Sequence, residues 1–286
     1  MRRPSDIAFD QRSMGTLVEL TGVFEGLASM RIAQIKNQVQ QSQAFFDELW
    51  TIYTQLRVDS MFRFGRRQTD HVIIEKELII IITAEGGFSG DIDQKLIALM
   101  LKNYDKEKQD IIVIGHHGAV QLAQNGISFK KYFKLPERDQ NINSEPIIAQ
   151  VQKYKSTTVY YQTYISLMVQ DVKRISLASA VQQKGHKIKT DHEETISEDT
   201  YIFEPSTFAV VDHLERSMLQ IAVSQVILES KLAQYASRFR AMSSSHTRAD
   251  ELFSDLTLSY NRSLRSVKDE RLKEIINGLR KAGATT

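Results

Sequence analysis

Apolar residues recur at steps of three and four along most of the chain's last third. No glycine or proline interrupts the sequence between Pro205 and Gly278. A mean step of 3.5 residues is typical of a helix that winds left-handed around a partner helix. At 1.5 Å per residue this stretch would form a helix of roughly 100 Å. These positions, called the C-terminal seam below, are Leu214, Met218, Ile221, Gln225, Leu228, Leu232, Tyr235, Phe239, Met242, His246, Ala249, Phe253, Leu256 and Tyr260.

A second pattern of this kind predicts a helix over residues 13–57. Gly22 and Gly26 interrupt it, each at a cost of about 1 kcal/mol relative to alanine, and small residues there would let a partner helix come close. The sequence therefore predicts that the two terminal helices pair as an antiparallel coiled coil. The apolar positions of the first helix, called the N-terminal seam below, are Leu17, Leu20, Phe24, Leu27, Ile35, Val39, Phe46, Leu49, Tyr53 and Leu56.

The middle of the chain alternates between strand and helix patterns. Residues 77–83 are an aliphatic run that leads into a glycine-rich stretch, as a buried parallel strand does when it enters a tight turn. We expect helices at 93–104, 118–124 and 145–154, and further strands at 110–114, at 157–161 or on to 169, and at 172–181. Residues 182–199 are polar and predict a loop or hairpin. This alternation favours a parallel sheet covered by helices, a Rossmann-like α/β domain.

The predicted fold class is α/β, with an antiparallel coiled coil of long terminal helices and a central α/β domain. The predicted segments are an N-terminal coiled-coil helix at 1–60, the α/β domain at 61–203 and a C-terminal coiled-coil helix at 204–286. Because the C-terminal helix is the longer one, we expect its end to extend past its partner.

Composition narrows the function classes. The 286 residues carry a formal charge of +2, which gives no electrostatic case for nucleic acid. There is no apolar run of about 18 residues and no apolar signal region near the start. The absence of cysteine excludes disulfides and cysteine-ligated metals. No phosphate-binding loop of the G-x-x-x-x-G-K-[ST] type occurs, which fits our expectation of neither a catalytic site nor a bound cofactor.

Three features of the central domain are candidates for chemistry. The stretch from Gly86 to Gly90 is either a phosphate loop or, as we favour, a turn that packs helix on strand, since Glu85, Asp91 and Asp93 would repel an anion. Those three acids are either metal ligands or, as we favour, solvated turn residues. The pair His116–His117 is either a metal site or an ordinary loop pair, and adjacent side chains usually point apart.

Several sequence segments resemble the gamma subunit of the F-type ATP synthase. Residues 20–31, LTGVFEGLASMR, resemble the family's I-T-x-A-M-x-M-V-A-A-S-K, and residues 87–93 resemble the end of its T-D-R-G-L-C-G-G-L-N motif. Residues 201–205 resemble Y-x-x-E-P, residues 237–242 resemble A-R-M-x-A-M, residues 256–261 resemble L-x-L-x-Y-N, and residues 272–275 resemble L-x-E-I. The order of these segments along the chain and the spacing between them also resemble those of the family.

The resemblance implies a central-stalk rotor, a non-catalytic shaft that couples ion flow through a membrane ring to ATP synthesis or hydrolysis. It implies contacts with the alpha and beta subunits of a catalytic head, with an epsilon-type stalk subunit and with a c-type membrane ring. It also implies a peripheral location on the cytoplasmic side of the cell membrane. The alternatives are the shaft of a variant rotary ATPase, a coiled-coil scaffold and an α/β enzyme with helical arms. The last lacks a convergent set of acid, base and nucleophile.

Basic residues on the two helices are the candidate partner contacts. After the segment at 256–261, where the family touches the catalytic subunits, this chain departs from the family's usual residues. In the segment at 20–31, Arg31 stands where the family has its final lysine. These side chains either form ordinary solvated faces or touch acidic loops of the catalytic ring. His246 in the C-terminal seam either titrates near neutral pH or, as we favour, is simply packed there. The candidate contacts are Arg31, Lys36, Arg238, Arg240, Arg248, Arg262, Arg265, Lys268 and Arg271.

Overall fold

A computed structural model describes residues 2–55, 74–137, 139, 142–177 and 202–283. Its contacts divide the chain into two compact units, residues 28–238 and residues 1–27 with 239–286. The first unit contains a five-stranded sheet, and two long helices, α1 (Pro4–Gln55) and α6 (Thr207–Gly283), each run through both units. The predicted segment boundary at residue 60 and the predicted loop at 182–199 lie outside the described residues, so the three-segment division stays a prediction.

The sheet has the strand order β3-β2-β1-β4-β5. Strands β1 (Ile74–Ile82), β2 (Gln109–Ile114), β3 (Lys131–Phe133) and β4 (Tyr154–Tyr164) are parallel, as predicted for the region as a whole. Strand β5 (Gln170–Ser176) pairs antiparallel with β4. It follows β4 by a short connection, which permits only the antiparallel arrangement because a parallel one needs a crossover.

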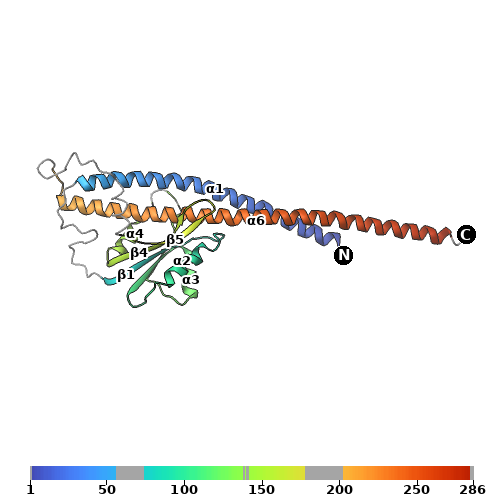
Figure 1. Ribbon diagram of the computed structural model, residues 1–286, viewed down its shortest axis with the longest axis horizontal. Coiled ribbons are helices and arrows are strands. Elements are labelled where there is room, and N and C mark those ends of the chain that lie inside the picture. Colours follow the sequence, from blue (N-terminus) through green and yellow to red (C-terminus); the bar gives the residue numbers. More distant parts are fainter. Residues whose placement is uncertain (1, 56–73, 138, 140–141, 178–201, 284–286) are drawn as a thin grey trace. The chain divides into compact units, whose positions relative to one another are not determined.

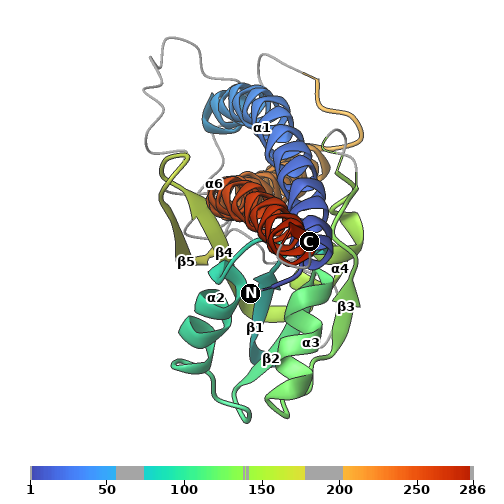
Figure 2. The same cartoon turned by 90° about the vertical axis from the view of Figure 1, so that its right-hand side faces the viewer.

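Side chains of β1 alternate between two cores, one on each face of the sheet. Ile79 and Ile81 pack with α2 (Ile92–Leu101) and α3 (His116–Gln124) on one face. Ile80 and Ile82 pack with α4 (Glu145–Val151) and with α6 on the other. Figure 2 shows the sheet between α2 and α3 on one side and α6 on the other. The predicted Rossmann-like α/β fold is confirmed, and α6 supplies one of its covering layers.

Within residues 28–238, α1 and α6 lie side by side and antiparallel (Figure 1). Ile35 is fully buried against Leu228 and Leu232, and the Gln225 side-chain amide donates to the Gln43 side-chain oxygen at 2.6 Å. Every described C-terminal seam residue in this unit is buried or half-buried. The predicted seam and coiled coil are therefore confirmed here.

The unit of residues 1–27 and 239–286 is also an antiparallel helix pair. The Gln11 side-chain amide donates to the Thr257 hydroxyl at 2.8 Å, and Gly15 faces the ring of Phe253. Gly22 faces the ring of His246, seven residues back on α6 from Phe253. The predicted close approach therefore occurs at Gly22, where a Cβ would lie 3.4 Å from the imidazole. It does not occur at Gly26, which has no described atom within 4 Å of such a Cβ.

Three of the first four residues of the N-terminal seam, Leu17, Leu20 and Leu27, do not lie buried in the helix interface, and the prediction is wrong at these positions. Leu17 and Leu20 are each 48% exposed, and Phe24 and Leu27 are 38% and 46% exposed. Helix α1 pairs instead through Gln11, Gly15 and Gly22. Leu17 lies two residues after Gly15 and Leu20 two residues before Gly22. A shift of two residues turns a side chain by about 200° around the helix, so Leu17 and Leu20 point away from α6.

The end of α6 extends beyond its partner, as predicted. The last described contact of this helix with the start of the chain is from the Ser263 hydroxyl to the Arg2 carbonyl, at 3.4 Å. The helix continues to Gly283, about 30 Å further at 1.5 Å per residue. Every residue from 268 to 280 is exposed.

Candidate partner interface

The candidate contacts on α1 are Arg31 and Lys36, and both are exposed. The Arg31 guanidinium lies 3.7 Å from the Asp139 carboxylate and donates to the Gln34 side chain at 3.3 Å. Arg31 thus has one acidic neighbour in the segment after β3, and part of its guanidinium faces solvent. Lys36 lies five residues further along α1, about 140° around the helix from Arg31.

Arg238 lies against the glycine-rich turn. Its guanidinium donates to the carbonyls of Gly87 at 3.1 Å and Gly86 at 3.3 Å, and stacks over the Tyr235 ring with its carbon 5.1 Å from the ring centre. A phosphate loop would present N–H groups to an anion, whereas this turn presents carbonyl oxygens to a cation. The arrangement supports the interpretation of residues 86–90 as a packing turn.

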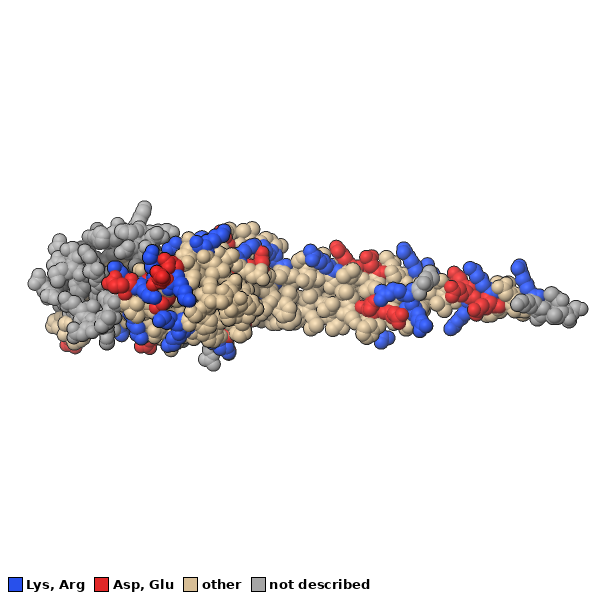
Figure 3. Space-filling model, turned by 90° about the horizontal axis from the view of Figure 1, so that it is seen from below, with Lys and Arg blue, Asp and Glu red and all other residues tan. Residues whose placement is uncertain are grey.

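The remaining candidate contacts lie on α6 in the unit of residues 1–27 and 239–286. Arg240 is half-buried, and Arg248 is exposed. Each step of three along a helix turns back by about 60°, so the exposed residues Arg262, Arg265, Lys268 and Arg271 spiral half-way around α6. Figure 3 shows acidic and basic side chains interspersed toward the right-hand end of the view, and Asp269 and Glu270 lie between Lys268 and Arg271 in the sequence. The structure therefore does not gather these four into a single basic face.

Glu85 and Asp91 of the central domain have separate partners. Glu85 accepts from the backbone N–H groups of His116 and Leu135, at 3.2 and 3.1 Å, and Asp91 pairs with Lys95 at 2.8 Å. The His116 side chain is exposed. Among the described residues, no cluster of three histidine or carboxylate side chains is placed to hold a metal ion.

Asp93 is only 2% exposed, so its interpretation as a solvated turn acid is wrong. Its carboxylate accepts from the Gln162 side-chain amide at 2.6 Å and from the Ala84 N–H at 3.3 Å. The His117 ring nitrogen Nδ1 lies 3.1 Å away. Burial raises the pKa of Asp93 above the ordinary carboxyl value, and the hydrogen bond with His117 partly opposes that rise. The sequence shows an acid after a turn, and nothing in its spacing reveals the partners on β4 and α3.

Lys231 is a further buried charge that the sequence analysis missed. Its side chain is 3% exposed, contacts the Asp139 carboxylate and donates to the Pro136 carbonyl at 2.8 Å. It therefore ties α6 to the segment after β3. The only signal in the sequence is a lysine adjacent to a seam residue, Leu232, which is also common on solvated helix faces.

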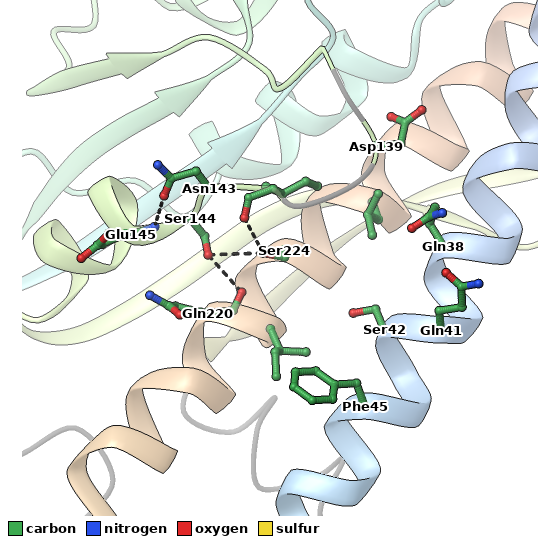
Figure 4. A pocket seen from close by; sticks show the side chains of 13 residues that line it. Gln38, Gln41, Ser42, Phe45, Asp139, Asn143, Ser144, Glu145, Gln220 and Ser224 are labelled. Carbon is green, nitrogen blue, oxygen red and sulfur yellow. Dashed lines mark hydrogen bonds between the residues drawn. The ribbon is translucent and has the colours of Figure 1, made fainter. Parts of the chain in front are cut away.

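A hollow of about 600 Å³ lies between α1, α6 and the segment that leads into α4 (Figure 4). The Ser144 hydroxyl donates to the Gln220 carbonyl at 3.1 Å, and the Ser224 hydroxyl lies 3.2 Å from that of Ser144. Among the described residues that line the hollow, Asp139 and Glu145 carry charge and both are acidic. Amides and hydroxyls supply most of its other polar groups, a lining unsuited to phosphate.

Two apolar surfaces remain exposed in the unit of residues 1–27 and 239–286. One is the exposed apolar face of α1 that includes Leu17, Leu20 and Leu27, and Val23, which is 59% exposed, belongs to it. The other is a stripe at the end of α6 with the spacing of one helix face. This α6 end stripe consists of Leu272, Ile275, Ile276 and Leu279, which are 56%, 58%, 49% and 68% exposed.

The profile of the ATP synthase family matches residues 11–280. The chain belongs to this family. An ATP synthase gamma chain of Chlorobium phaeobacteroides (strain BS1) is 24% identical over 96% of both chains. An ATP synthase gamma chain of Halothermothrix orenii is 23% identical over 97% of this chain and 98% of that one. The resemblance to the gamma subunit is confirmed, and with it the assignment as a central-stalk rotor chain of ATP synthase.

Solved structures of ATP synthases share the fold. A chain of the Euglena gracilis mitochondrial ATP synthase, in a structure of OSCP, F1 and c-ring, superposes with a TM-score of 0.64 at 15% identity, covering 98% of this chain and 95% of that one. A chain from the central stalk and c-ring of the Tetrahymena thermophila enzyme gives 0.58 at 17% identity, covering 79% and 98%. In the described part of this ATP synthase family chain, no helix is both long and apolar enough to cross a membrane.

Proposed function

We propose that this chain is the non-catalytic shaft of a rotary ATP synthase, and that it couples ion flow through a c-type membrane ring to ATP synthesis or hydrolysis. Its partners in this proposal are the alpha and beta subunits of the catalytic head, an epsilon-type stalk subunit and the ring. Within the complex, this chain would lie peripherally on the cytoplasmic side of the cell membrane. Support comes from the family match along nearly the whole chain and from relatives that are gamma chains.

The observation that carries the proposal is the exposed end of α6. Residues 268–280 of this helix are all exposed, yet they include the α6 end stripe. Grouped apolar side chains on an exposed helix face mark a surface that another protein covers. A ring of catalytic subunits around the helix end would cover such a stripe while the shaft turns.

Basic side chains add a second kind of contact. In our proposal, Arg31, Lys36, Arg240 and Arg248 face acidic loops of the catalytic ring, and the spiral of Arg262, Arg265, Lys268 and Arg271 meets successive subunits. Arg238 contributes less, because its guanidinium already binds two carbonyls of the glycine-rich turn. A spiral of charge suits a rotating shaft, since each orientation presents a different side chain to a given subunit.

The mechanism follows from this asymmetry. Each orientation of the shaft stabilises one conformation of each surrounding catalytic site, because a partner shifts a conformational equilibrium by its different affinity for the two states. The shaft itself carries out no bond chemistry in this proposal. The residues that first suggested chemistry, Glu85 and Asp93 among them, serve here as hydrogen-bond acceptors inside the domain.

Co-purification with the catalytic head tests the proposal. Ile275→Gln combined with Leu279→Gln should weaken assembly with the head and lower the ATPase activity of the complex severalfold, while the chain itself stays folded because both residues are exposed. Glu274→Gln, on the opposite face of the same turn, is the matched control and should change little. Recovery of a stable complex without any nucleotide-binding ring subunits would exclude the proposal.

A further inference from the structure

A buried polar cluster joins the carboxyl end of the sheet to α6. We call it the edge network: Asp93 in the first turn of α2, Gln162 on β4, and Ser230 and Gln234 on α6. Asp93 is 2% exposed, Gln162 and Ser230 are fully buried and Gln234 is 4% exposed. The Gln162 side-chain amide donates to Asp93 at 2.6 Å, and its side-chain oxygen accepts from the Ser230 hydroxyl and from the Gln234 amide at 3.3 Å.

Asp93 sets the direction of these hydrogen bonds. An ionised carboxylate only accepts, so the Gln162 side chain must turn its NH₂ group toward Asp93. Its oxygen then faces α6, where Ser230 and Gln234 provide the two donors. The Gln234 amide also donates to the Ser230 hydroxyl at 3.0 Å, so the two α6 residues hold one another in place.

The same face of α6 continues to the glycine-rich turn. The buried Ser237 hydroxyl donates to the Ser89 carbonyl at 2.7 Å, and Arg238 donates to Gly86 and Gly87. Positions 230, 234 and 237 are spaced by four and three, which places them along one line of the helix surface. The polar contact therefore follows two turns of α6 across the edge of the sheet.

These bonds do what the neighbouring apolar contacts cannot. Apolar burial is non-directional, so an apolar helix face tolerates a small rotation or slide over a sheet. A buried polar network does not, because even a small displacement leaves its donors and acceptors unpaired at about 1–3 kcal/mol for each group. The edge network thus fixes both the rotation and the axial position of α6 on the α/β domain.

We propose that the edge network is a torsional joint of the rotor, a place where torque passes between the α/β domain and the shaft helix α6. This inference rests on the proposed shaft function. Helix α6 continues without a break to Gly283, so a joint at 230–237 transmits rotation along one covalent rod. Asp93 and Gln162 act as positioning residues, since they act through the α6 donors.

Hydrogen exchange on the purified full chain tests the joint itself. In Gln162→Leu, the amide protons of α6 near residues 230–238 should exchange severalfold faster than in the unaltered chain. Gln109→Leu is the matched control, because the Gln109 side chain bonds to Glu77 at 2.6 Å within the sheet and does not take part in the edge network. Equal exchange of α6 in the two variants would overturn the joint. If Gln162→Leu does not fold, Ser230→Ala with Gln234→Ala takes its place, with the same two outcomes.

Ion pumping by the reconstituted complex tests the transmission of torque. With Gln162→Leu in the complex, ions pumped per ATP hydrolysed should fall severalfold while ATP hydrolysis continues. Because the chain has no cysteine of its own, Ser89→Cys with Ser237→Cys adds a single cysteine pair across the joint, and mass spectrometry selects the preparations in which it is oxidised to a disulfide. Oxidation should restore pumping to the Gln162→Leu complex, and reduction should remove it again.

The outcomes separate the two proposals. Unchanged pumping per ATP in the Gln162→Leu complex, or a loss that the oxidised cross-link does not restore, would overturn the torsional joint. Failure of the unaltered complex to couple pumping to ATP would instead count against the proposed shaft function. In that case the exchange experiment still decides whether Gln162 fixes α6 on the sheet.

Discussion

At the scale of single residues, a buried ion pair connects α6 to the α/β domain. Lys231 and Asp139 form an ion pair with side chains 3% and 8% exposed, and the Pro136 carbonyl accepts from the same ammonium. Removing Lys231 would leave the buried Asp139 carboxylate with only the more distant Arg31 guanidinium, at 3.7 Å, as a described basic neighbour. The pair therefore makes α6 and the segment after β3 depend on one another.

We expect Lys231→Met to lower the free energy of unfolding by roughly 3 kcal/mol, the lower end for a broken buried pair. Lys155→Met is the matched control, because Lys155 pairs with Glu75 at 2.7 Å with side chains 64% and 78% exposed. An exposed pair contributes about 0–1 kcal/mol. Chemical denaturation of both variants measures the difference, and equal losses would show that burial of the Lys231 pair adds nothing.

Lys231 and Asp93 also show what sequence reasoning misses at this scale. A lysine beside a seam residue and an acid beside a turn both predict solvent exposure, since most such residues are solvated. Each is buried because partners distant in sequence, Asp139 and Gln162, lie across the fold. Local pattern contains no information about such pairs, whereas the aliphatic run of β1 specifies burial by itself.

At the scale of elements, α1 has two faces that the sequence analysis did not separate. The apolar positions Leu17, Leu20, Phe24 and Leu27 and the contacting positions Gln11, Gly15 and Gly22 both step by three, four or seven. Periodicity alone therefore fits either set. Close packing selects the glycines, because they allow the ring side chains of α6 to approach the α1 backbone. The C-terminal seam had no such competitor and was predicted correctly.

The exposed face of α1 should tolerate polar side chains in the isolated chain. Leu17→Gln with Leu20→Gln should leave the free energy of unfolding within about 1 kcal/mol of the original, because both side chains are already half exposed. Ile35→Gln, at a fully buried position of the same helix, should cost about 3 kcal/mol or more. Thermal or chemical denaturation compares the two, and a large loss in the double variant would place Leu17 and Leu20 inside the helix interface after all.

At the scale of the whole molecule, the strand–helix alternation and the two long seams specified the fold class, and the family profile agrees with it along residues 11–280. The exposed apolar face of α1 was not predicted, because it depends on which surfaces meet after the chain has folded. The antiparallel pairing of β5 follows from its short connection to β4, and the expectation of a parallel sheet did not use that length. The candidate contacts from Arg238 to Arg271 lie on α6, which is the predicted C-terminal helix. Their spiral arrangement follows from their spacing in the sequence and from helix geometry.

Three tyrosines make the stability of the fold sensitive to alkali. Burial raises the pKa of Tyr161 to about 12, and the neighbouring Glu229 adds to the rise. The pKa values of Tyr53, beside Glu215, and Tyr154, beside Asp110, are each raised to about 12, again chiefly by burial. The unfolded chain ionises near pH 10, so the folded state holds these protons more tightly. Their contribution to stability is complete below pH 10 and is lost as the pH rises toward 12.

Tyr161→Phe tests this linkage directly. The phenylalanine cannot ionise, so the variant should lose less unfolding free energy than the original chain between pH 9 and pH 12, with the values at pH 7 as the reference. The sign follows from the raised pKa: the original chain must give up a proton from a buried group in the folded state, and that ionisation favours unfolding. Denaturant titrations at a series of pH values measure both curves. Parallel curves across this range would mean that Tyr161 ionises equally well in the folded and unfolded chain, which its burial beside Glu229 argues against.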